Sequence, residues 1–215
     1  MFALGGMKLV IATPSPYARK ARVALLEKGI TFESVIDLPW NPGAAAAGLN
    51  PLGKIPILLL DDGRTIHDSK VIVEYLETLG VPPPLLPADP GARVAHRQIE
   101  ATADGVCDAV VLTVMERSRA SALQSADWIA RQRAKVEAGT RALAGELGTR
   151  RWFTGDGFGL ADIAVGCMLG YLDLRLAEFD WRSRHPNLVA FAAHLFARPS
   201  FAQTVPQAQD IAPVR

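Results

Sequence analysis

The chain has 215 residues, of which 49% are hydrophobic and 21% are charged, and its formal net charge at pH 7 is +1. This composition excludes a disordered chain, because it contains enough apolar surface for a packed core. The near-neutral charge gives no support for nucleic-acid binding, which requires a basic surface. The length allows one large domain or two modest ones.

The first eighty residues alternate between strand and helix signals. Residues 8–12 and 32–36 are short runs typical of strands. Residues 16–28 between them have a helical composition, and Gly29 stands where a left-handed residue would end that helix. Residues 38–54 are rich in Pro, Asn, Gly and Ala, which predicts a loop with at most one short helix.

A hairpin and a second helix complete this region. Residues 57–60 form an apolar strand, residues 61–63 are typical of a hairpin turn, and residues 65–66 can pair back. A helix then opens at residues 68–69, shows an apolar face with helical spacing, and ends at Gly80. The order βαβ then ββα predicts a small mixed sheet with helices packed against it.

The second half of the chain has a different pattern. Five prolines fall within residues 82–91, which favours an extended linker. Beyond it strand signals vanish, and four segments are helical in pattern: residues 93–120, 127–147, 160–176 and 187–197. We therefore predict an α/β domain over residues 7–82, a proline-rich linker over residues 83–91 and an all-α helical bundle over residues 92–215.

Cysteine usage and the opening residues bear on location. Cys107 and Cys167 lie far apart within apolar helical patterns, which is typical of buried thiols in a reducing compartment. The opening stretch MFALGGMKLV has no basic segment, so it predicts neither a secretory signal nor a membrane span. The apolar run 160–172 is also too short, because a spanning helix needs about 20 residues. We expect a cytoplasmic protein with no membrane partner.

The motif S-P-Y-A at residues 15–18 opens the first predicted helix. Ser15 followed by Pro16 is a common N-cap pattern, and capping alone accounts for both residues. The same geometry stabilises an anion, and a serine hydroxyl there can donate to a thiolate. The motif is similar to the redox motif C-P-Y-C with both cysteines replaced, so a reacting thiol would have to arrive with the substrate.

Two more motifs of the same half could bind a ligand. Pro56 is tolerated at the start of a strand, but a cis Ile55–Pro56 bond would turn the backbone of Ile55 outward to pair with a peptide-like ligand. Asp68 and Ser69 form a helix cap that could also hold the ammonium and carboxylate groups of an amino acid. Three such features on one small unit argue for a ligand more strongly than any one of them.

From residue 7 to residue 206 the chain resembles the glutathione S-transferases. The segments S-P-Y-A-R-K-A-R-V-A-L, N-P-L-G-K-I-P and D-S-K-V-I-V-E-Y-L resemble the family's thioredoxin-like half, and F-G-L-A-D-I-A-V-G and H-P-N-L-V-A-F-A-A-H resemble its helical half. The overall sequence pattern is most similar to that of bacterial cytosolic members with an active-site serine. The resemblance implies an α/β thioredoxin-like N-terminal domain, an all-α helical-bundle C-terminal domain and a homodimer.

The resemblance also implies roles for particular residues. Ser15 would be catalytic, although Tyr17 remains an alternative hydroxyl donor. The implied glutathione-binding set is Ser15, Trp40, Lys54, Ile55, Pro56, Asp68 and Ser69. Glutathione is the implied co-substrate, and no metal is implied, because the four histidines show no ligand spacing.

A small hydrophobic electrophile is implied as the second substrate, in a pocket between the two halves. The implied lining is Pro16, Tyr17, Asp108, Val111 and Met115. Asp104 shares this helical face, and the two aspartates could equally face a dimer partner. The alternatives to a transferase are a glutathione-dependent isomerase or dehalogenase of one metabolite, and a non-catalytic member that binds glutathione or a protein.

Two smaller expectations concern charged residues. The family usually has Ser or Thr where this chain has Gly159, and Asp162 can still accept the Gly159 backbone N–H, which is half of a capping box. Arg19, Lys20 and Arg22 are expected to form a solvated or salt-bridged face of the first helix.

Overall fold

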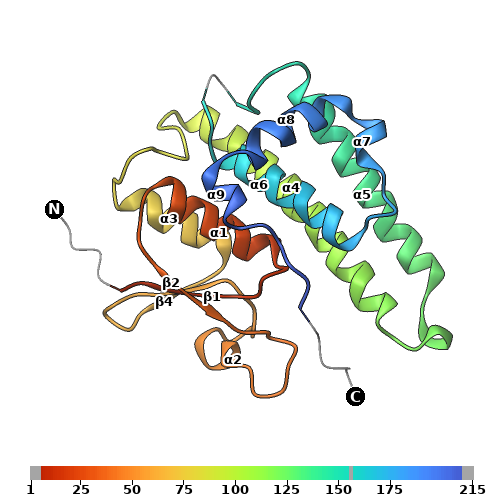
Figure 1. The fold of residues 1–215 in the computed structure, drawn as a ribbon, viewed down its shortest axis with the longest axis horizontal. Coiled ribbons are helices and arrows are strands. Elements are labelled where there is room, and N and C mark those ends of the chain that lie inside the picture. The colour runs from red at the N-terminus through yellow and green to blue at the C-terminus, as the bar shows by residue number, and fades with distance from the viewer. Residues whose placement is uncertain (1–5, 155–156, 210–215) are drawn as a thin grey trace. The chain divides into compact units, whose positions relative to one another are not determined.

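A computed structural model describes residues 6–154 and 157–209 (Figure 1). These residues divide into two compact units. The first unit holds the residues up to Leu85 together with those from Ser200 onward, and the second holds Leu86–Pro199. The first is an α/β unit and the second is helical, which confirms the predicted combination of a thioredoxin-like and an all-α architecture.

The first unit is built on a four-stranded sheet with the order β2-β1-β3-β4. The central strand β1 (Lys8–Ile11) pairs in parallel with β2 (Glu33–Ile36) and antiparallel with β3 (Ile57–Leu59). Strand β4 (Thr65–Ile66) pairs antiparallel with β3 through the predicted hairpin. The mixed sheet predicted from the sequence is confirmed.

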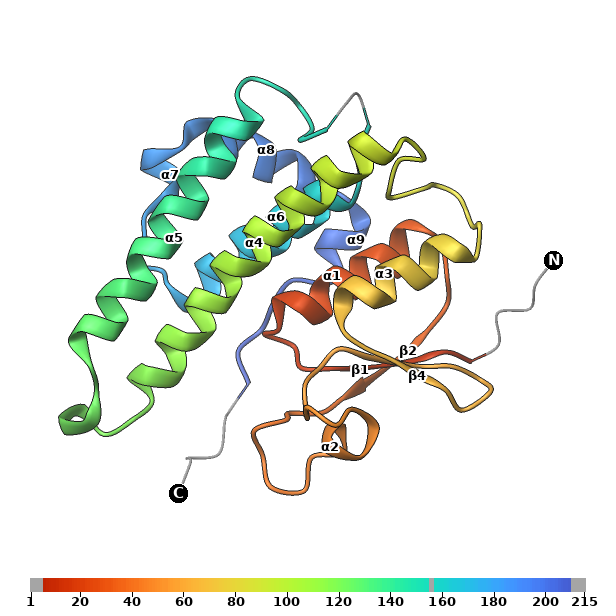
Figure 2. The same ribbon diagram turned by 180° about the vertical axis from the view of Figure 1, so that it is seen from behind.

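Helices cover both faces of this sheet. They are α1 (Pro16–Glu27), α2 (Ala46–Leu49) and α3 (Ser69–Thr78). Figures 1 and 2 show α1 and α3 side by side on one face, with α2 on the opposite side. Buried Val10 and Ile57 pack with Ala46 of α2, because successive strand residues point to opposite faces.

The ends of α1 and α3 are fixed as the sequence predicts and are joined by one lysine. Gly29 and Gly80 adopt the left-handed conformation, with φ of 62° and 65°, which side chains with a Cβ rarely take. The buried Lys28 ammonium pairs with Glu77 at 2.8 Å and donates to the carbonyls of Val81 and Pro83 at 2.8 and 3.0 Å. The chain leaving α3 is therefore fixed to the end of α1.

The segment from Ser200 onward lies with the first unit, whereas the sequence grouped it with the helical half. Helix α9 (Pro199–Ala202) leads into it. The Arg19 guanidinium donates to the Phe201 carbonyl at 3.2 Å and lies 5.0 Å from the centre of the Phe201 ring. Arg19 and Lys20 are buried, so of the two alternatives expected for this face of α1, the solvated one is wrong for both residues. The physical reason at Arg19 is the returning chain.

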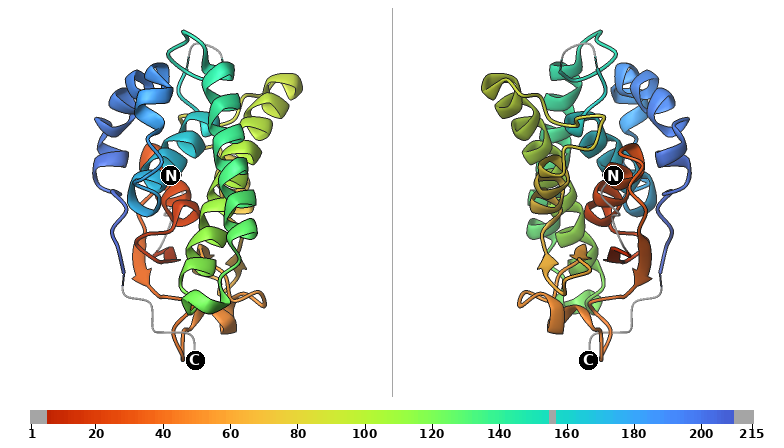
Figure 3. Two further views of the ribbon diagram at one scale, coloured as in Figure 1. Left: turned by 90° about the vertical axis from the view of Figure 1, so that its right-hand side faces the viewer. Right: turned by 90° about the vertical axis from the view of Figure 1, so that its left-hand side faces the viewer.

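The second unit consists of helices. They are α4 (Pro90–Arg117), α5 (Ala126–Leu147), α6 (Leu160–Arg175), α7 (Trp181–Arg184) and α8 (Pro186–Phe196), with a 3-10 turn at Ser121–Leu123. Figure 3 shows α4 and α5 running side by side. Helix α4 begins before the predicted residue 93, because Asp89 caps it by accepting the Ala92 N–H at 2.7 Å and Pro90 fits its first turn.

Helix α6 is buried on all sides over Leu160–Leu172, as its apolar run predicts. Both cysteines are buried: Cys167 in α6 and Cys107 in α4 are each 2% exposed, and neither is in a disulfide. Over residues 6–154 and 157–209, none of the helices is both long and apolar enough to cross a membrane.

The N-terminus of α6 is closed by Asp162. Its carboxylate accepts the backbone N–H of Gly159 and that of Phe153, each at 2.9 Å, which confirms the predicted half of a capping box. Burial raises the pKa of Asp162 from 3.8 to about 6, against the opposing effect of the two hydrogen bonds. The buried carboxyl therefore ties the start of α6 to the segment before it.

Candidate functional site

Ser15 lies where the chain turns from β1 into α1. The Ser15 N–H donates to the Ala12 carbonyl at 3.1 Å, which closes the turn. The Ser15 Oγ accepts the Ala18 N–H at 3.2 Å, so the predicted N-cap is confirmed. Among the residues that the structure describes, no acceptor takes the hydroxyl hydrogen of Ser15. The hydroxyl is thus able to donate to an anion at the positive end of α1.

The residues after Ser15 belong to the first turn of α1. Pro16 is buried at the first helical position, and Tyr17 follows it partly exposed. Tyr17 therefore lies close in the chain to the same helix end as Ser15. Its role as an alternative hydroxyl donor stays a prediction.

The Ile55–Pro56 bond is cis, as the sequence interpretation proposed. Pro56 is buried directly before β3, and Ile55 packs its side chain on the core beside Val10 and Ala46. Over the described ranges, neither the N–H nor the C=O of Ile55 has a hydrogen-bond partner. Both backbone groups can therefore pair with an extended ligand.

Asp68 and Ser69 open α3 in the predicted way. One Asp68 carboxylate oxygen accepts the Lys70 N–H at 2.9 Å, and the side chain is exposed to solvent. Ser69 is 2% exposed, yet its hydroxyl bonds to nothing in the described part of the chain. The pair thus offers a carboxylate for an ammonium group, and a hydroxyl and helix N–H groups for a carboxylate.

The sheet register brings these three features to one edge. Val10 near the end of β1 pairs with Ile57 at the start of β3, so the segments of Ser15 and Ile55 leave the sheet together. Leu58 of β3 pairs with Ile66 at the end of β4, so the start of α3 lies at this edge as well. Ser15, Ile55 and Ser69, which span more than fifty positions of the sequence, therefore all lie at this edge of the sheet.

Trp40 and Lys54 are the two remaining residues of the predicted glutathione-binding set. β2 is parallel to β1, so the loop with Trp40 also leaves from this edge, and the Trp40 side chain is 39% exposed. Lys54 is exposed, and its carbonyl accepts the Asn50 side-chain amide at 2.8 Å. A shallow hollow of about 380 Å³ lies beside this loop, lined by Ile36, Asp37, Leu38, Asn41, Pro42, Gly43, Ala44 and Gln209.

The predicted electrophile residues of the second unit all lie on α4. Asp104 is buried, Asp108 is exposed, and Val111 and Met115 are partly buried. Their part in a pocket stays a prediction, as does the choice between a pocket and a dimer partner for the two aspartates.

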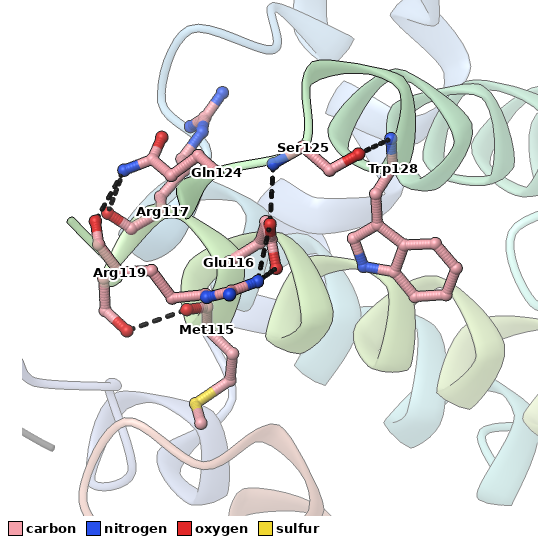
Figure 4. Close-up of polar contacts among 8 residues, drawn as sticks. Met115, Glu116, Arg117, Arg119, Gln124, Ser125 and Trp128 are labelled. Atoms are coloured by element: carbon pink, nitrogen blue, oxygen red, sulfur yellow. Dashed lines mark hydrogen bonds and ion pairs between the residues drawn. The ribbon is translucent and has the colours of Figure 1, made fainter. Parts of the chain in front are cut away.

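Polar contacts close the tip between α4 and α5, next to Met115 (Figure 4). The Glu116 carboxylate accepts the Ser125 N–H at 2.7 Å and pairs with Arg119 at 3.2 Å. Ser125 caps α5 by accepting the Trp128 N–H at 3.2 Å. α5 thus begins with a serine cap whose Oγ to N distance equals that of the Ser15 cap of α1.

The described residues contain no group of side chains suited to bind a metal ion. Within residues 6–154 and 157–209, no three His, Cys, Asp or Glu side chains are grouped to hold an ion. His96 lies in α4, where its ring contacts Thr154 and accepts the Ala161 N–H at 3.4 Å, and burial lowers its pKa. His96 therefore serves the packing of the helical unit.

The α/β unit, with two helix N-termini at one end of its sheet, and the helical unit both match the glutathione S-transferase family. Residues 14–79 match the model of the glutathione S-transferase N-terminal domain, and residues 126–194 match that of the C-terminal domain. An uncharacterized GST-like protein of Escherichia coli, YibF, is 44% identical over 93% of this chain and 98% of its own length. The chain belongs to the glutathione S-transferase family.

Other relatives extend this comparison. A maleylacetoacetate isomerase of Pseudomonas aeruginosa is 30% identical over 96% of this chain and 99% of its own length. A glutathione S-transferase of Methylobacterium radiotolerans, solved with glutathione sulfonate, is 51% identical with a TM-score of 0.94, covering 96% of this chain and 98% of its own. A family member from Pseudomonas fluorescens with bound glutathione is 37% identical with a TM-score of 0.85, covering 94% and 100%.

Proposed function

We propose that this chain is a glutathione transferase that binds glutathione as a thiolate and adds it to a small hydrophobic electrophile. One observation carries the proposal. The Ser15 hydroxyl caps α1 with its own hydrogen uncommitted in the described structure, at the sheet edge where Ile55 and Ser69 also lie. The related structures solved with glutathione or its sulfonate support the choice of ligand.

Glutathione matches the polar groups along this edge. The N–H and C=O of Ile55 pair with the cysteinyl part of the tripeptide. Ser69 and the first N–H groups of α3 bind the γ-glutamyl carboxylate, and Asp68 binds its ammonium group. Lys54 and Trp40 lie toward the glycine end. This orientation directs the sulfur to Ser15.

The chemistry then depends on the thiol pKa. A free thiol has a pKa of about 8.5, and a helix N-terminus together with a donated hydrogen bond lowers it. The thiol proton passes to solvent, and the thiolate sulfur forms a bond to an electrophilic carbon. The displaced electron pair leaves with a leaving group or takes a proton from water. Proximity supplies the rest of the rate enhancement, without a covalent bond to the protein.

The second substrate is proposed to contact Pro16, Tyr17, Asp108, Val111 and Met115. These residues combine apolar and polar groups, which suits an electrophile with a hydrophobic body and a polar reacting end. We place the enzyme in the cytoplasm as a homodimer, with neither nucleic acid nor membrane as a partner.

An isomerase is the second candidate, because the maleylacetoacetate isomerase of Pseudomonas aeruginosa matches this chain over nearly its full length. The same thiolate would add reversibly to one metabolite, so glutathione would be released unchanged. Consumption of glutathione during turnover separates the two candidates. Binding of glutathione without turnover of any electrophile would instead indicate a non-catalytic member of the family.

The test compares two serine caps. Ser15→Ala and Ser125→Ala each remove a cap with an Oγ to N distance of 3.2 Å, but only Ser15 lies at the proposed site. Glutathione binding is measured by calorimetry, and the pKa of the bound thiol by ultraviolet absorbance against pH. We expect Ser15→Ala to raise that pKa by about one unit and to lower kcat/KM about 10–100-fold, as the loss of a charge-assisted hydrogen bond predicts. Ser125→Ala should leave both unchanged.

Two results would contradict the proposal. A wild-type chain that gives no heat with glutathione removes the ligand and with it the transferase activity. An unchanged thiol pKa in Ser15→Ala keeps glutathione but removes Ser15 from catalysis, and Tyr17→Phe is then the next variant.

A further inference from the structure

The segment that starts within α9 runs antiparallel to α1, from the C-terminal end of that helix to the turn before it (Figure 2). Ser200 bonds to Glu27 at the end of α1. Further along, the Arg22 guanidinium donates to the Gln203 carbonyl at 3.2 Å. We name residues 200–209 the C-terminal strap.

Gln207 and Gln209, near the end of the strap, form hydrogen bonds with Thr13 in the turn before α1. The Thr13 N–H donates to Gln209 Oε1 at 2.8 Å, and the Thr13 hydroxyl donates to the Gln207 carbonyl at 3.0 Å. The Gln207 N–H donates to the Thr13 carbonyl at 3.4 Å. All three polar groups of Thr13 are therefore bonded to the strap.

Thr13 lies inside the turn that places the proposed catalytic hydroxyl. The turn is closed by the Ser15 N–H and the Ala12 carbonyl at 3.1 Å, with Thr13 and Pro14 at its corners. A shift of Thr13 would move Ser15 relative to the N–H groups of α1. Small displacements of a catalytic group cost much of its effect, because a hydrogen bond weakens steeply with distance and angle.

We infer that Gln207 and Gln209 are positioning residues that act through Thr13 to hold the Ser15 hydroxyl against the glutathione sulfur. This inference rests on the proposed function. The strap has other attachments for stability, since Ser200, Phe201 and Thr204 are buried and bonded along α1. Gln207 is exposed and Gln209 is only partly buried, so their bonds to Thr13 contribute little burial and mainly fix the turn.

The same strap supplies a matched control. Gln203 has an exposed side chain, and its contact with Arg22 of α1 is made by the backbone carbonyl. Gln203→Ala therefore removes the same side-chain type without touching Thr13. Thr13→Ser keeps the hydroxyl that donates to Gln207, whereas Thr13→Val removes it at nearly constant shape.

The experiment measures the pKa of bound glutathione, KM for glutathione, kcat and the thermal midpoint for Gln209→Ala, Thr13→Val, Thr13→Ser, Gln203→Ala and a chain ending at Pro206. We expect Gln209→Ala and Thr13→Val to raise the bound thiol pKa by about half a unit or more and to lower kcat/KM about 2–10-fold, the range that one neutral hydrogen bond supports. The shortened chain should show the larger effect. Thr13→Ser and Gln203→Ala should match the wild type.

The outcomes separate this inference from the proposed function. A wild type with a depressed thiol pKa that Gln209→Ala, Thr13→Val and the shortened chain all leave unchanged overturns the positioning role and leaves the transferase intact. A lower thermal midpoint with no change in thiol pKa also overturns it, because a purely structural strap predicts that result. A wild type that binds no glutathione overturns the proposed function itself.

Discussion

The N-termini of α1 and α6 follow the same capping rule and differ in what surrounds them. At α6 the Asp162 carboxylate is buried and accepts two backbone N–H groups. At α1 the Ser15 hydroxyl accepts one N–H and stays partly exposed, with its hydrogen uncommitted among the described residues. A helix cap anchors the fold where neighbouring backbone groups bond to it. A helix cap can bind an anion where its hydroxyl still needs an acceptor and a ligand can supply one.

The anchor should show the largest loss of stability. Asp162→Ala leaves the buried N–H groups of Gly159 and Phe153 without partners, so we expect the free energy of unfolding at pH 5 to fall by about 3–4 kcal/mol. Denaturant unfolding measures this. Asp127→Ala removes an exposed aspartate from the first turn of α5 and should cost less than about 1 kcal/mol. Equal losses in the two variants would erase the contrast between buried and exposed caps.

The buried carboxyl should also make stability depend on pH. Its pKa is raised to about 6 in the folded chain from an ordinary value of 3.8, so the folded state binds the proton more tightly between these values. The stabilising contribution is complete below about pH 4 and is lost as the pH rises through about 6, a change of about 3 kcal/mol. Comparison of the wild type with Asp162→Asn across pH 4–7 isolates it. A difference that grows with pH would reverse the sign.

The smallest expected loss of stability is that of the two serine-cap variants, and it separates the capping role of Ser15 from its proposed catalytic role. Ser15→Ala and Ser125→Ala should each lower the free energy of unfolding by about 1 kcal/mol, the usual value of a serine cap. Thermal and denaturant unfolding of both variants provide the measurement. A much larger loss for Ser15→Ala would mean that Ser15 holds the fold, and a fall in its activity would then no longer report on the thiolate.

Much of the fold could be predicted because its signals are local. Ser15–Pro16 and Asp68–Ser69 mark helix starts, and Gly29 marks a helix end. The apolar run 160–172 predicts a helix buried all round. Pro56 at a strand start suggested the cis Ile55–Pro56 bond that the structure contains, and the resemblance to the glutathione S-transferases predicted the architecture.

The rest depends on contacts that short sequence windows do not contain. Arg19 was expected on a solvated or salt-bridged face because a cation on a helix usually faces water or an acidic partner, but the strap supplies a carbonyl and an aromatic ring from far along the chain. Helix α7 is one short turn with little periodicity. Thr13 had no signal at all, because its partners Gln207 and Gln209 are polar residues in a segment with no helical or strand pattern.

The two cysteines of the chain lie in the cores of α4 and α6, each nearly closed to solvent. A transferase of the proposed kind brings electrophiles to a sulfur nucleophile, so its own thiols are also targets for alkylation. Under this proposal, the burial of Cys107 and Cys167 leaves the glutathione sulfur as the accessible nucleophile, so the electrophile reacts with a molecule that can be replaced. Folded protein incubated with iodoacetamide should therefore keep its mass, and should gain two carbamidomethyl groups only after denaturation.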